Sequence, residues 1–420
     1  NFSPNHRFGF FPSIALGYVV SNEKFFAPIR DVVSMVKLKA SYGLVGNDQI
    51  GGDRRFIYNE TVIGGGKYYF GTTPSQYTSV RLGEFPNPNV GWEKAKKLNL
   101  GADLSFFNQL NISVDYFKEN REGIFLQRKS IPMYVGLSTK PWVNIGKMRN
   151  SGIDASLEYH QPLGKDLHLT VRSNFTYARN RIMDQDEPDY AYTYMNHSGQ
   201  MQWQKFGLVA AGLFQDQEDI DSWAKQSFGE VKPGDIKYLD LNGDGIVDNY
   251  DTKPIGYSDI PEIVYGFGFS LQWKAFDLSA FFQGVAHVSF STLTDQTQAF
   301  VGRNLKESSV FADLYGNTWT PENPGAKYPR MTTGAVDNNN QLSTFWMADG
   351  RYLRLKNLEL GYTLPKRIAN KIAMQNLRVY LSGVNLFTFS PFKLWDPDLQ
   401  TGATNYPNNR IINLGLTIGF

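Results

Sequence analysis

The feature that most constrains this chain is a strict alternation of apolar with polar or very small residues. Along residues 98–106, LNLGADLSF, every even position is apolar and every odd position is polar or tiny. Successive side chains of a β-strand point to opposite faces of a sheet, so a period of two predicts a strand with one apolar face.

The same alternation recurs along the whole chain, and we count about a dozen such segments, many of them roughly 9 to 12 residues long. Clear examples lie at residues 36–43, 153–159, 167–172, 265–273 and 412–420. This is about the length that a tilted strand needs to cross a bilayer. No stretch reaches the roughly 18 consecutive apolar residues of a spanning helix.

Two architectures bury one face of many antiparallel strands. A soluble sandwich or barrel turns the apolar face inward, whereas an outer-membrane barrel turns it outward around a wet lumen. The opposite face carries Lys, Asp, Glu, Arg, Asn and many Gly, which fits either a solvated surface or such a lumen.

Three further features favour the membrane barrel. Aromatic residues sit at the ends of the apolar faces, where interfacial girdles belong; they are Tyr42, Phe106, Tyr159, Phe175, Tyr177 and Trp273. Short connections at 107–109 and 273–275 alternate with long polar stretches at 180–200, 216–260 and 291–344. The third feature is the last segment, which alternates up to a terminal aromatic, Phe420.

One segment breaks the alternation. Leu353 and Leu355 lie on one parity, whereas Leu358 and Leu360 lie on the other. A β-bulge inserts one extra residue and so changes the parity. We therefore predict a bulge near Lys356 and Asn357, or a strand that leaves the membrane there.

Composition excludes several classes of protein. The 42 Lys and Arg against 40 Asp and Glu leave a net charge of +2, which offers no basic face for a nucleic-acid backbone. Without cysteine the chain has no disulfide, thiolate zinc site or cysteine nucleophile.

The first residues lack the basic segment and apolar core of a signal peptide. We expect a processed chain or a piece of a longer one.

The clearest local motif is an acidic loop at residues 240–251. Oxygen ligands at positions 1, 3 and 5, a glycine at 6, a backbone carbonyl at 7 and a carboxylate at 12 form the calcium-loop pattern. The predicted ligands are Asp240, Asn242, Asp244, Ile246 through its carbonyl, Asp248 and Asp251. Position 12 is Asp rather than Glu, so we expect a structural calcium ion that pins a long loop; the alternative is an Asx-rich turn without metal.

Catalytic motifs are missing from the sequence. It contains no G-x-S-x-G, no P-loop and no H-E-x-x-H, and the five histidines show no metal-ligand spacing. We therefore expect a chain that is not an enzyme.

Several stretches resemble one family, the SusC/RagA-type TonB-dependent outer-membrane transporters of the Bacteroidota. They occur in family order, from residue 36 to near the end. They are VKLKASYGLVGN at 36–47, PNPNVGWE at 86–93, NSGID at 150–154, GDIKYLDLNGDGIVD at 234–248, WTPENP at 319–324, YLRLKNL at 352–358, GYTLP at 361–365 and NLF at 385–387.

The resemblance implies an antiparallel transmembrane barrel of about 22 strands in the outer membrane. Residues 1–420 would be its C-terminal half, with long extracellular loops. An N-terminal plug, a TonB-binding segment and the first strands would belong to a part that this chain lacks. The expected function is TonB-dependent import of a bulky nutrient, a glycan or an oligopeptide, together with a SusD-like surface lipoprotein that forms a lid.

Other functions stay open at this point. A passive porin would need an open lumen and no plug, and a barrel enzyme would need catalytic groups that converge at one rim. A soluble calcium-dependent adhesin would be recovered without detergent. The sequence does not decide between glycan and peptide as cargo, because importers of both kinds would share the same wall motifs.

Overall fold

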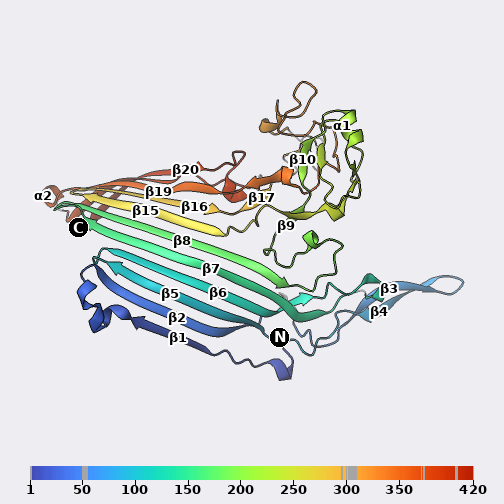
Figure 1. Cartoon of the computed structure of the whole chain (residues 1–420), viewed down its shortest axis with the longest axis horizontal. Helices are drawn as coiled ribbons and strands as arrows, with labels where there is room; N and C mark the ends of the chain where they lie inside the picture. Colours follow the sequence, from blue (N-terminus) through green and yellow to red (C-terminus); the bar gives the residue numbers. More distant parts are fainter. Residues whose placement is uncertain are drawn as a thin grey trace.

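In a computed structural model of the chain, eleven strands form one curved antiparallel sheet (Figure 1). The structure describes residues 2–49, 55–137, 139–294, 297–298, 300, 310–369, 371, 374–402 and 405–419. The sheet order is β1 (Ser13–Val19), β2 (Val33–Asn47), β5 (Glu93–Phe106), β6 (Leu110–Gln127), β7 (Trp142–Pro162), β8 (Leu167–Asp184), β15 (Ile263–Trp273), β16 (Phe276–Ala286), β19 (Tyr352–Thr363), β20 (Asn376–Phe389) and β21 (Ile411–Gly419). None of the helices in these described ranges has the length and apolar character needed to cross a membrane.

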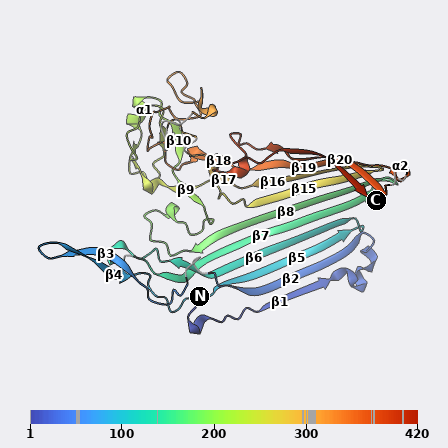
Figure 2. The ribbon, with the colours of Figure 1, turned by 180° about the vertical axis from the view of Figure 1, so that it is seen from behind.

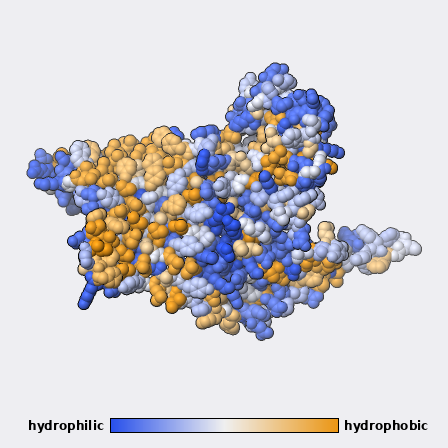
Figure 3. All heavy atoms as spheres, viewed as in Figure 1, coloured by the Kyte–Doolittle hydropathy of each residue, from blue (hydrophilic) through white to orange (hydrophobic). Residues whose placement is uncertain are grey.

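The predicted strands and their faces are confirmed. Every alternating segment named above lies inside a strand of this sheet, except that Phe420 falls outside the described residues. The apolar face is exposed: Leu16 and Leu414 show 69% and 79% of their surface. In Figure 3, hydrophobic residues gather over the part of the sheet nearer the short turns. Such a broad apolar face is stable against hydrocarbon rather than water.

The connections differ sharply between the two ends of the sheet. At one end the strands are joined by tight turns, such as the β5–β6 turn, in which Phe107 and Asn108 both have positive φ and the amide of Gln109 donates to the carbonyl of Phe106. At the other end lie the long connections and the β3 (Val62–Phe70) and β4 (Ser75–Leu82) hairpin, which projects away from the sheet in both ribbon views (Figures 1 and 2).

The predicted bulge is confirmed. The pairing of β19 with β20 shifts between Leu355 and Asn357, and the pairing of β16 with β19 shifts at the same level. Leu355 is paired with Phe282 and Leu358 with Ala280, two positions of equal parity on β16. The extra residue therefore keeps the apolar side chains of β19 on one face on both sides of the bulge.

The long polar stretches at 216–260 and 291–344 are structured in their described parts. These parts and their neighbours pack into a loop module, which we define as the described parts of residues 205–260 and 310–350 (Figures 1 and 2). Its elements are β9 (Lys205–Gly207), β10 (Ala210–Leu213), α1 (Gln217–Ser222), β11 (Lys225–Gln226), β12 (Ile236–Tyr238), β13 (Ile246–Val247), β14 (Lys253–Ile255) and β18 (Met347–Asp349). The last of these pairs with β17 (Ser289–Ser291), and α2 (Lys366–Ala369) lies at the short-turn end of the sheet.

The loop module is ordered because it has a hydrophobic core of its own. The buried cluster joins Leu208, Leu213, Ile236, Tyr238, Val247, Leu314, Trp319, Tyr328 and Trp346. Burial of apolar surface of this extent compensates the entropy cost of ordering a long connection. The stretch 180–200 is also shorter than predicted, because β8 continues to Asp184.

Candidate functional site

The polar face of the sheet carries ion pairs that cross several strands. Lys39 on β2 lies 2.7 Å from Asp103 on β5 and 3.2 Å from Asp115 on β6. Arg172 on β8 lies 2.9 Å from Glu158 on β7. These charges face the side opposite to the apolar surface, so the apolar face meets lipid and this face borders a water-filled space.

A third cluster lies nearer the end of the chain. Arg378 on β20 bridges Asp277 on β16 and Glu359 on β19.

Glycines occur where the long side chains of these ion pairs cross the sheet. A Cβ at Gly361 would lie 2.4 Å from the Arg378 guanidinium, and one at Gly101 would lie 2.1 Å from the Asp115 carboxylate. A Cβ at either position would displace the end of an ion-paired side chain, so the two glycines leave room for these ion pairs.

The sheet is hollowed beside the first two of these clusters, those of Asp103 and of Arg172. A cavity of about 440 Å³ is lined by the polar side chains of Asp103, Ser113, Ser156, Glu158 and Arg172 and by the apolar side chains of Met35, Leu104, Ile112 and Leu157. Charged, hydroxyl and apolar side chains thus share its lining.

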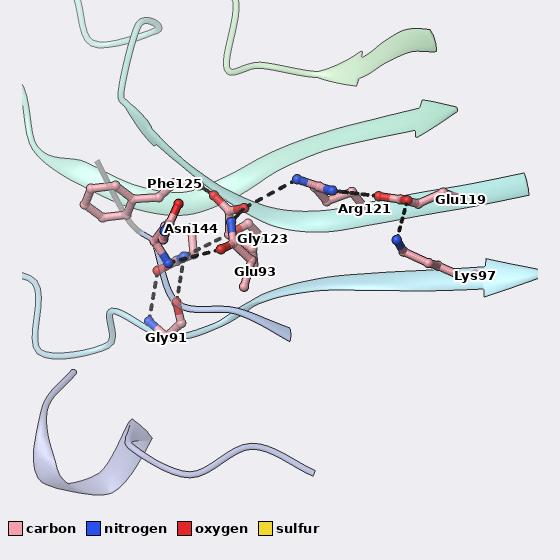
Figure 4. A network of polar contacts seen from close by, with 10 residues as sticks. Gly91, Glu93, Lys97, Glu119, Arg121, Gly123, Phe125 and Asn144 are labelled. Atoms are coloured by element: carbon pink, nitrogen blue, oxygen red, sulfur yellow. Dashed lines mark hydrogen bonds and ion pairs between the residues drawn. The ribbon is translucent and has the colours of Figure 1, made fainter. Parts of the chain in front are cut away.

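A second polar network lies at the long-loop ends of β5, β6 and β7 (Figure 4). Lys97 lies 3.1 Å from Glu119, and Arg121 lies 2.8 Å from Glu119 and 4.0 Å from Glu93. The buried carboxylate of Glu93 also accepts hydrogen bonds from the Phe125 amide and the Asn47 side chain, at 3.2 and 2.8 Å. Each charge in this network is compensated by a neighbour.

The family-like stretch at 86–93 holds this corner of the wall together. Asn144 accepts a hydrogen bond from the Gly91 amide at 3.0 Å, and its side-chain amide donates to the carbonyls of Gly91 and Gly123 (Figure 4). Gly123 has a φ of +69°, which favours glycine. Val90 is fully buried beside Phe125. The described contacts of this stretch are thus structural, because they fix residues 86–93 to β6 and β7.

Arg354 forms the most deeply buried charged group of the described wall. Only 1% of its side chain is exposed; its guanidinium pairs with Asp396, lies 2.9 Å from Asp398 and donates to the Thr388 hydroxyl at 3.0 Å. A cavity of about 420 Å³ opens beside it, lined also by Asn385, Ser390, Phe392, Lys393, Trp395, Asn408 and Arg410. Sequence reasoning missed this site because its carboxylates come from a loop more than 40 residues away.

Inside the loop module, buried polar groups are paired as well. The fully buried Asp235 lies 2.8 Å from Arg330 and accepts hydrogen bonds from Asn339 and the Lys232 amide, both at 2.8 Å. Burial raises the pKa of the Tyr238 hydroxyl, which donates to the Asn338 carbonyl. Hydrogen bonds from Lys327 and Tyr328 lower the pKa of Asp313. The module is thus held by polar contacts in addition to its apolar core.

The acidic loop predicted to bind calcium lies on the surface of this module. The structure brings its side chains together through hydrogen bonds to backbone amides. Asp240 accepts from Gly243 and Gly245, Asp244 accepts from Ile246, and the buried Asp251 accepts from Leu241, Asn242 and Asp248. Asp248 and Asp251 form a capping box.

These contacts are those of an Asx-rich turn. In this arrangement the side chains of the loop do not form a preformed set of metal ligands. Among the described residues, no group of three or more acidic, His or Cys side chains is placed to hold a metal. A carboxylate oxygen that accepts one amide hydrogen bond still has a free lone pair. Calcium binding by Asp240, Asn242, Asp244, Ile246, Asp248 and Asp251 therefore stays a prediction.

We expect calcium to raise the melting temperature of the loop module in the full-length protein. An ion that binds only the folded loop stabilises it by mass action. Differential scanning fluorimetry in calcium, in magnesium and in a chelator measures the effect. The variant Asp244→Ala should lose the calcium response, whereas Glu230→Ala, at an exposed acid of the same module, should keep it. Identical melting curves in calcium and in chelator would leave the Asx-turn interpretation.

Aromatic residues of the long loops serve mainly in packing. Trp319 and Trp346 lie in the module core, and Trp395 contacts Phe392 with ring centroids 4.7 Å apart. Tyr192 and Tyr194 stack 5.4 Å apart at the surface. The tryptophans pack within the loops, whereas the two tyrosines offer the flat apolar surface on which a sugar ring or a planar side chain can stack.

Comparison with known proteins places these features in context. Residues 1–386 match the family model described as TonB dependent receptor-like, beta-barrel. The whole chain aligns with 43% of TonB-dependent receptor P3 of Formosa agariphila at 30% identity. It aligns with 41% of TonB-dependent receptor SusC of Bacteroides thetaiotaomicron at 26% identity.

Solved structures show the same fold. The chain superposes on a structure of the RagAB peptide transporter with a TM-score of 0.75 and 23% identity, covering 100% of this chain and 44% of that one. The open-open state of the RagAB peptide importer gives a TM-score of 0.76 at 22% identity. The chain thus spans less than half the length of the relatives that it matches.

Proposed function

Because the chain belongs to the TonB-dependent receptor-like β-barrel family, we propose that it forms the C-terminal half of an importer barrel in the outer membrane. The family consists of transporters, and the chain is an outer-membrane β-barrel protein. The proposed activity is TonB-dependent uptake of a bulky nutrient, either a glycan or an oligopeptide. We expect no catalysis by these residues.

The observation that carries this proposal is the two-faced wall. One face is broadly apolar and exposed, and the other bears three ion-pair clusters, two of which contribute to the lining of a hollow of about 440 Å³. A wall of this kind separates lipid from a hydrated passage. The loop module at its outer end supplies a structured rim for capture of cargo.

The two unpaired edges of the sheet indicate what the proposed partners are. Among the described strands, β1 and β21 each pair on one side only. An unpaired strand edge in lipid leaves backbone groups unsatisfied, so the proposal includes further barrel strands and a plug from the N-terminal part of the same transporter. TonB would act through that part. A SusD-like lipoprotein would cover the loop module, and outer-membrane lipid would surround the wall.

An uptake assay tests the proposal. Cells that carry the full-length transporter should accumulate labelled oligosaccharides or oligopeptides, and uptake should fall to background when the proton gradient is collapsed or TonB is deleted. Cells without the transporter are the control for background uptake. The class of labelled compound that accumulates identifies the cargo.

The same assay separates the rival functions. Uptake that persists without TonB or the proton gradient would indicate a passive porin. Conversion of the labelled compound by purified protein would indicate a barrel enzyme. Purification of the full-length protein in mild detergent tests the partners, since a SusD-like lipoprotein should co-purify in equal amount.

A further inference from the structure

The lipid-side face of four adjacent strands becomes strongly basic where the apolar band ends. On β5, β6, β7 and β8 the last apolar positions of this face are Leu98, Tyr116, Ile153 and Tyr177. Beyond them, on the same face and toward the long loops, lie seven cations. One of them, Arg179, pairs with the buried Glu262 at 3.1 Å. The other six, which we call the outer basic belt, are Lys94, Lys96, Lys118, Lys147, Arg149 and Arg181. Lys118 is half-buried and the other five are exposed.

The strand register proves that the belt is on the outer face. Leu100 pairs with Tyr116, and Tyr116 pairs with Ile153, so these apolar residues form one row across the sheet. Counting in steps of two from that row leads to Lys118 on β6 and Arg149 on β7. The lumen-side charges Lys97 and Glu119 have the other parity. The belt therefore faces away from the passage for cargo.

The protein itself neutralises only part of this charge. The two carboxylates of these four strands that share the face are Glu122, 3.0 Å from Lys96, and Asp184, 3.9 Å from Lys147. Lys94, Lys118, Arg149 and Arg181 form no ion pair with any described residue. Arg149 donates only to the neutral amide of Asn120, at 3.1 Å.

Like charges also stand directly opposite each other. Arg149 on β7 is the cross-strand partner of Arg181 on β8. Like charges in directly opposed positions destabilise a sheet unless a counter-ion lies between them. Guanidinium groups bind phosphate oxygens in a planar fork, and ammonium groups bind them as point charges. The missing counter-ion is therefore an anion with phosphate chemistry.

We propose that the outer basic belt binds the phosphate groups of lipid headgroups in the outer leaflet. The belt begins within one or two same-face positions of the apolar band, and same-face residues of a strand are only about 7 Å apart. This is the depth at which headgroup phosphates lie next to a barrel. The face is turned toward lipid, so a headgroup rather than a free phosphate is the ligand. The site is independent of what the lumen transports.

Lipid retention by the full-length transporter tests this proposal. The protein is reconstituted in nanodiscs of phosphatidylcholine with diphosphorylated lipid A, extracted in detergent, and examined by native mass spectrometry. Wild type should retain the diphosphorylated lipid over phosphatidylcholine. Each cation near an anionic surface raises binding severalfold, so the triple variant Lys118→Gln/Arg149→Gln/Arg181→Gln should lose at least about tenfold in retention.

Two comparisons keep the result interpretable. The matched variant Lys37→Gln/Lys97→Gln/Arg172→Gln removes the same charge from the lumen side and should keep the lipid. Arg149→Lys/Arg181→Lys preserves the charge of the belt and should also keep it, which covers the case that the triple variant does not fold. Salt should reduce retention by wild type, because exposed charges are screened.

Three outcomes would overturn the proposal. One is equal retention of the diphosphorylated lipid by wild type and the folded triple variant. Another is equal loss in the lumen-side variant. The third is displacement of the lipid by inorganic phosphate together with stabilisation of lipid-free protein by inorganic phosphate, which would assign the belt to a free anion.

Discussion

Replacing Asp235 with alanine should unfold the loop module while the barrel wall stays folded. Asp235 is fully buried and is the ion-pair partner of Arg330 at 2.8 Å. Its removal leaves a largely buried guanidinium without a counter-charge, and breaking a buried pair in this way costs about 3–5 kcal/mol. It also removes the acceptor for Asn339, whose own carbonyl oxygen accepts from the Ile236 amide.

The loss should stay local because the module has its own core. Hydrogen exchange of the full-length protein should show lost protection at Ile236 and Tyr238, with unchanged protection in β6 and β7. The exposed acid Glu230, 3.7 Å from Lys232, offers a matched control: Glu230→Ala should change stability by less than about 1 kcal/mol. A normal exchange pattern in Asp235→Ala would show that the apolar core alone holds the module.

Strands and their faces were predictable from the sequence, because the two-residue period is a property of the extended backbone. Leu98 to Phe106 show the rule, and each of these residues lies in β5 with the predicted parity. Even the bulge at Lys356 and Asn357 was predictable, since a change of parity inside one apolar run has few other causes. Short turns were equally visible at Phe107 and Asn108.

The loop module was not predictable in the same way. Its core joins Leu208 with Trp346 and Tyr238 with Trp319, residues that are far apart in sequence and follow no regular period. Length and polarity of the stretches indicated only that they are long connections between strands. The buried pairs Asp235–Arg330 and Arg354–Asp396 depend on the same distant contacts. Such pairings need the three-dimensional arrangement, whereas periodicity is a local signal.

Cross-strand charge clusters form an intermediate case. Arg378 reaches Asp277 and Glu359 only because β16, β19 and β20 are neighbours in a fixed register. The two-residue period puts all three residues on the polar face of their strands, but it does not show that they lie beside one another. The outer basic belt is similar, since the parity of Arg181 is visible in the sequence and its position opposite Arg149 is not. The register between strands therefore decides which residues of one face become neighbours and form a site.

Replacing Arg354 with leucine should detach the segment that follows β20 from the wall. The arginine is 1% exposed and joins the carboxylates of Asp396 and Asp398 to β19. The tyrosine ring of Tyr352, 5.1 Å from its guanidinium carbon, packs against it. Leucine fills part of the volume but leaves two acids without a counter-charge. Because Asp396 and Asp398 keep some contact with water, we expect the lower end of the range for a broken buried pair, about 3 kcal/mol.

Arg351 provides a control three residues before Arg354 in the sequence. It is 64% exposed and lies 3.1 Å from Asp349, so Arg351→Leu should cost no more than about 1 kcal/mol. Limited proteolysis of the full-length transporter should cut Arg354→Leu between residues 390 and 402 and leave Arg351→Leu intact. Arg354→Lys keeps the charge without the planar fork and should give intermediate cleavage. If Arg354→Leu resists the protease as well as wild type does, the aromatic contacts of Phe392 and Trp395 with Phe290 hold the segment without the ion pair.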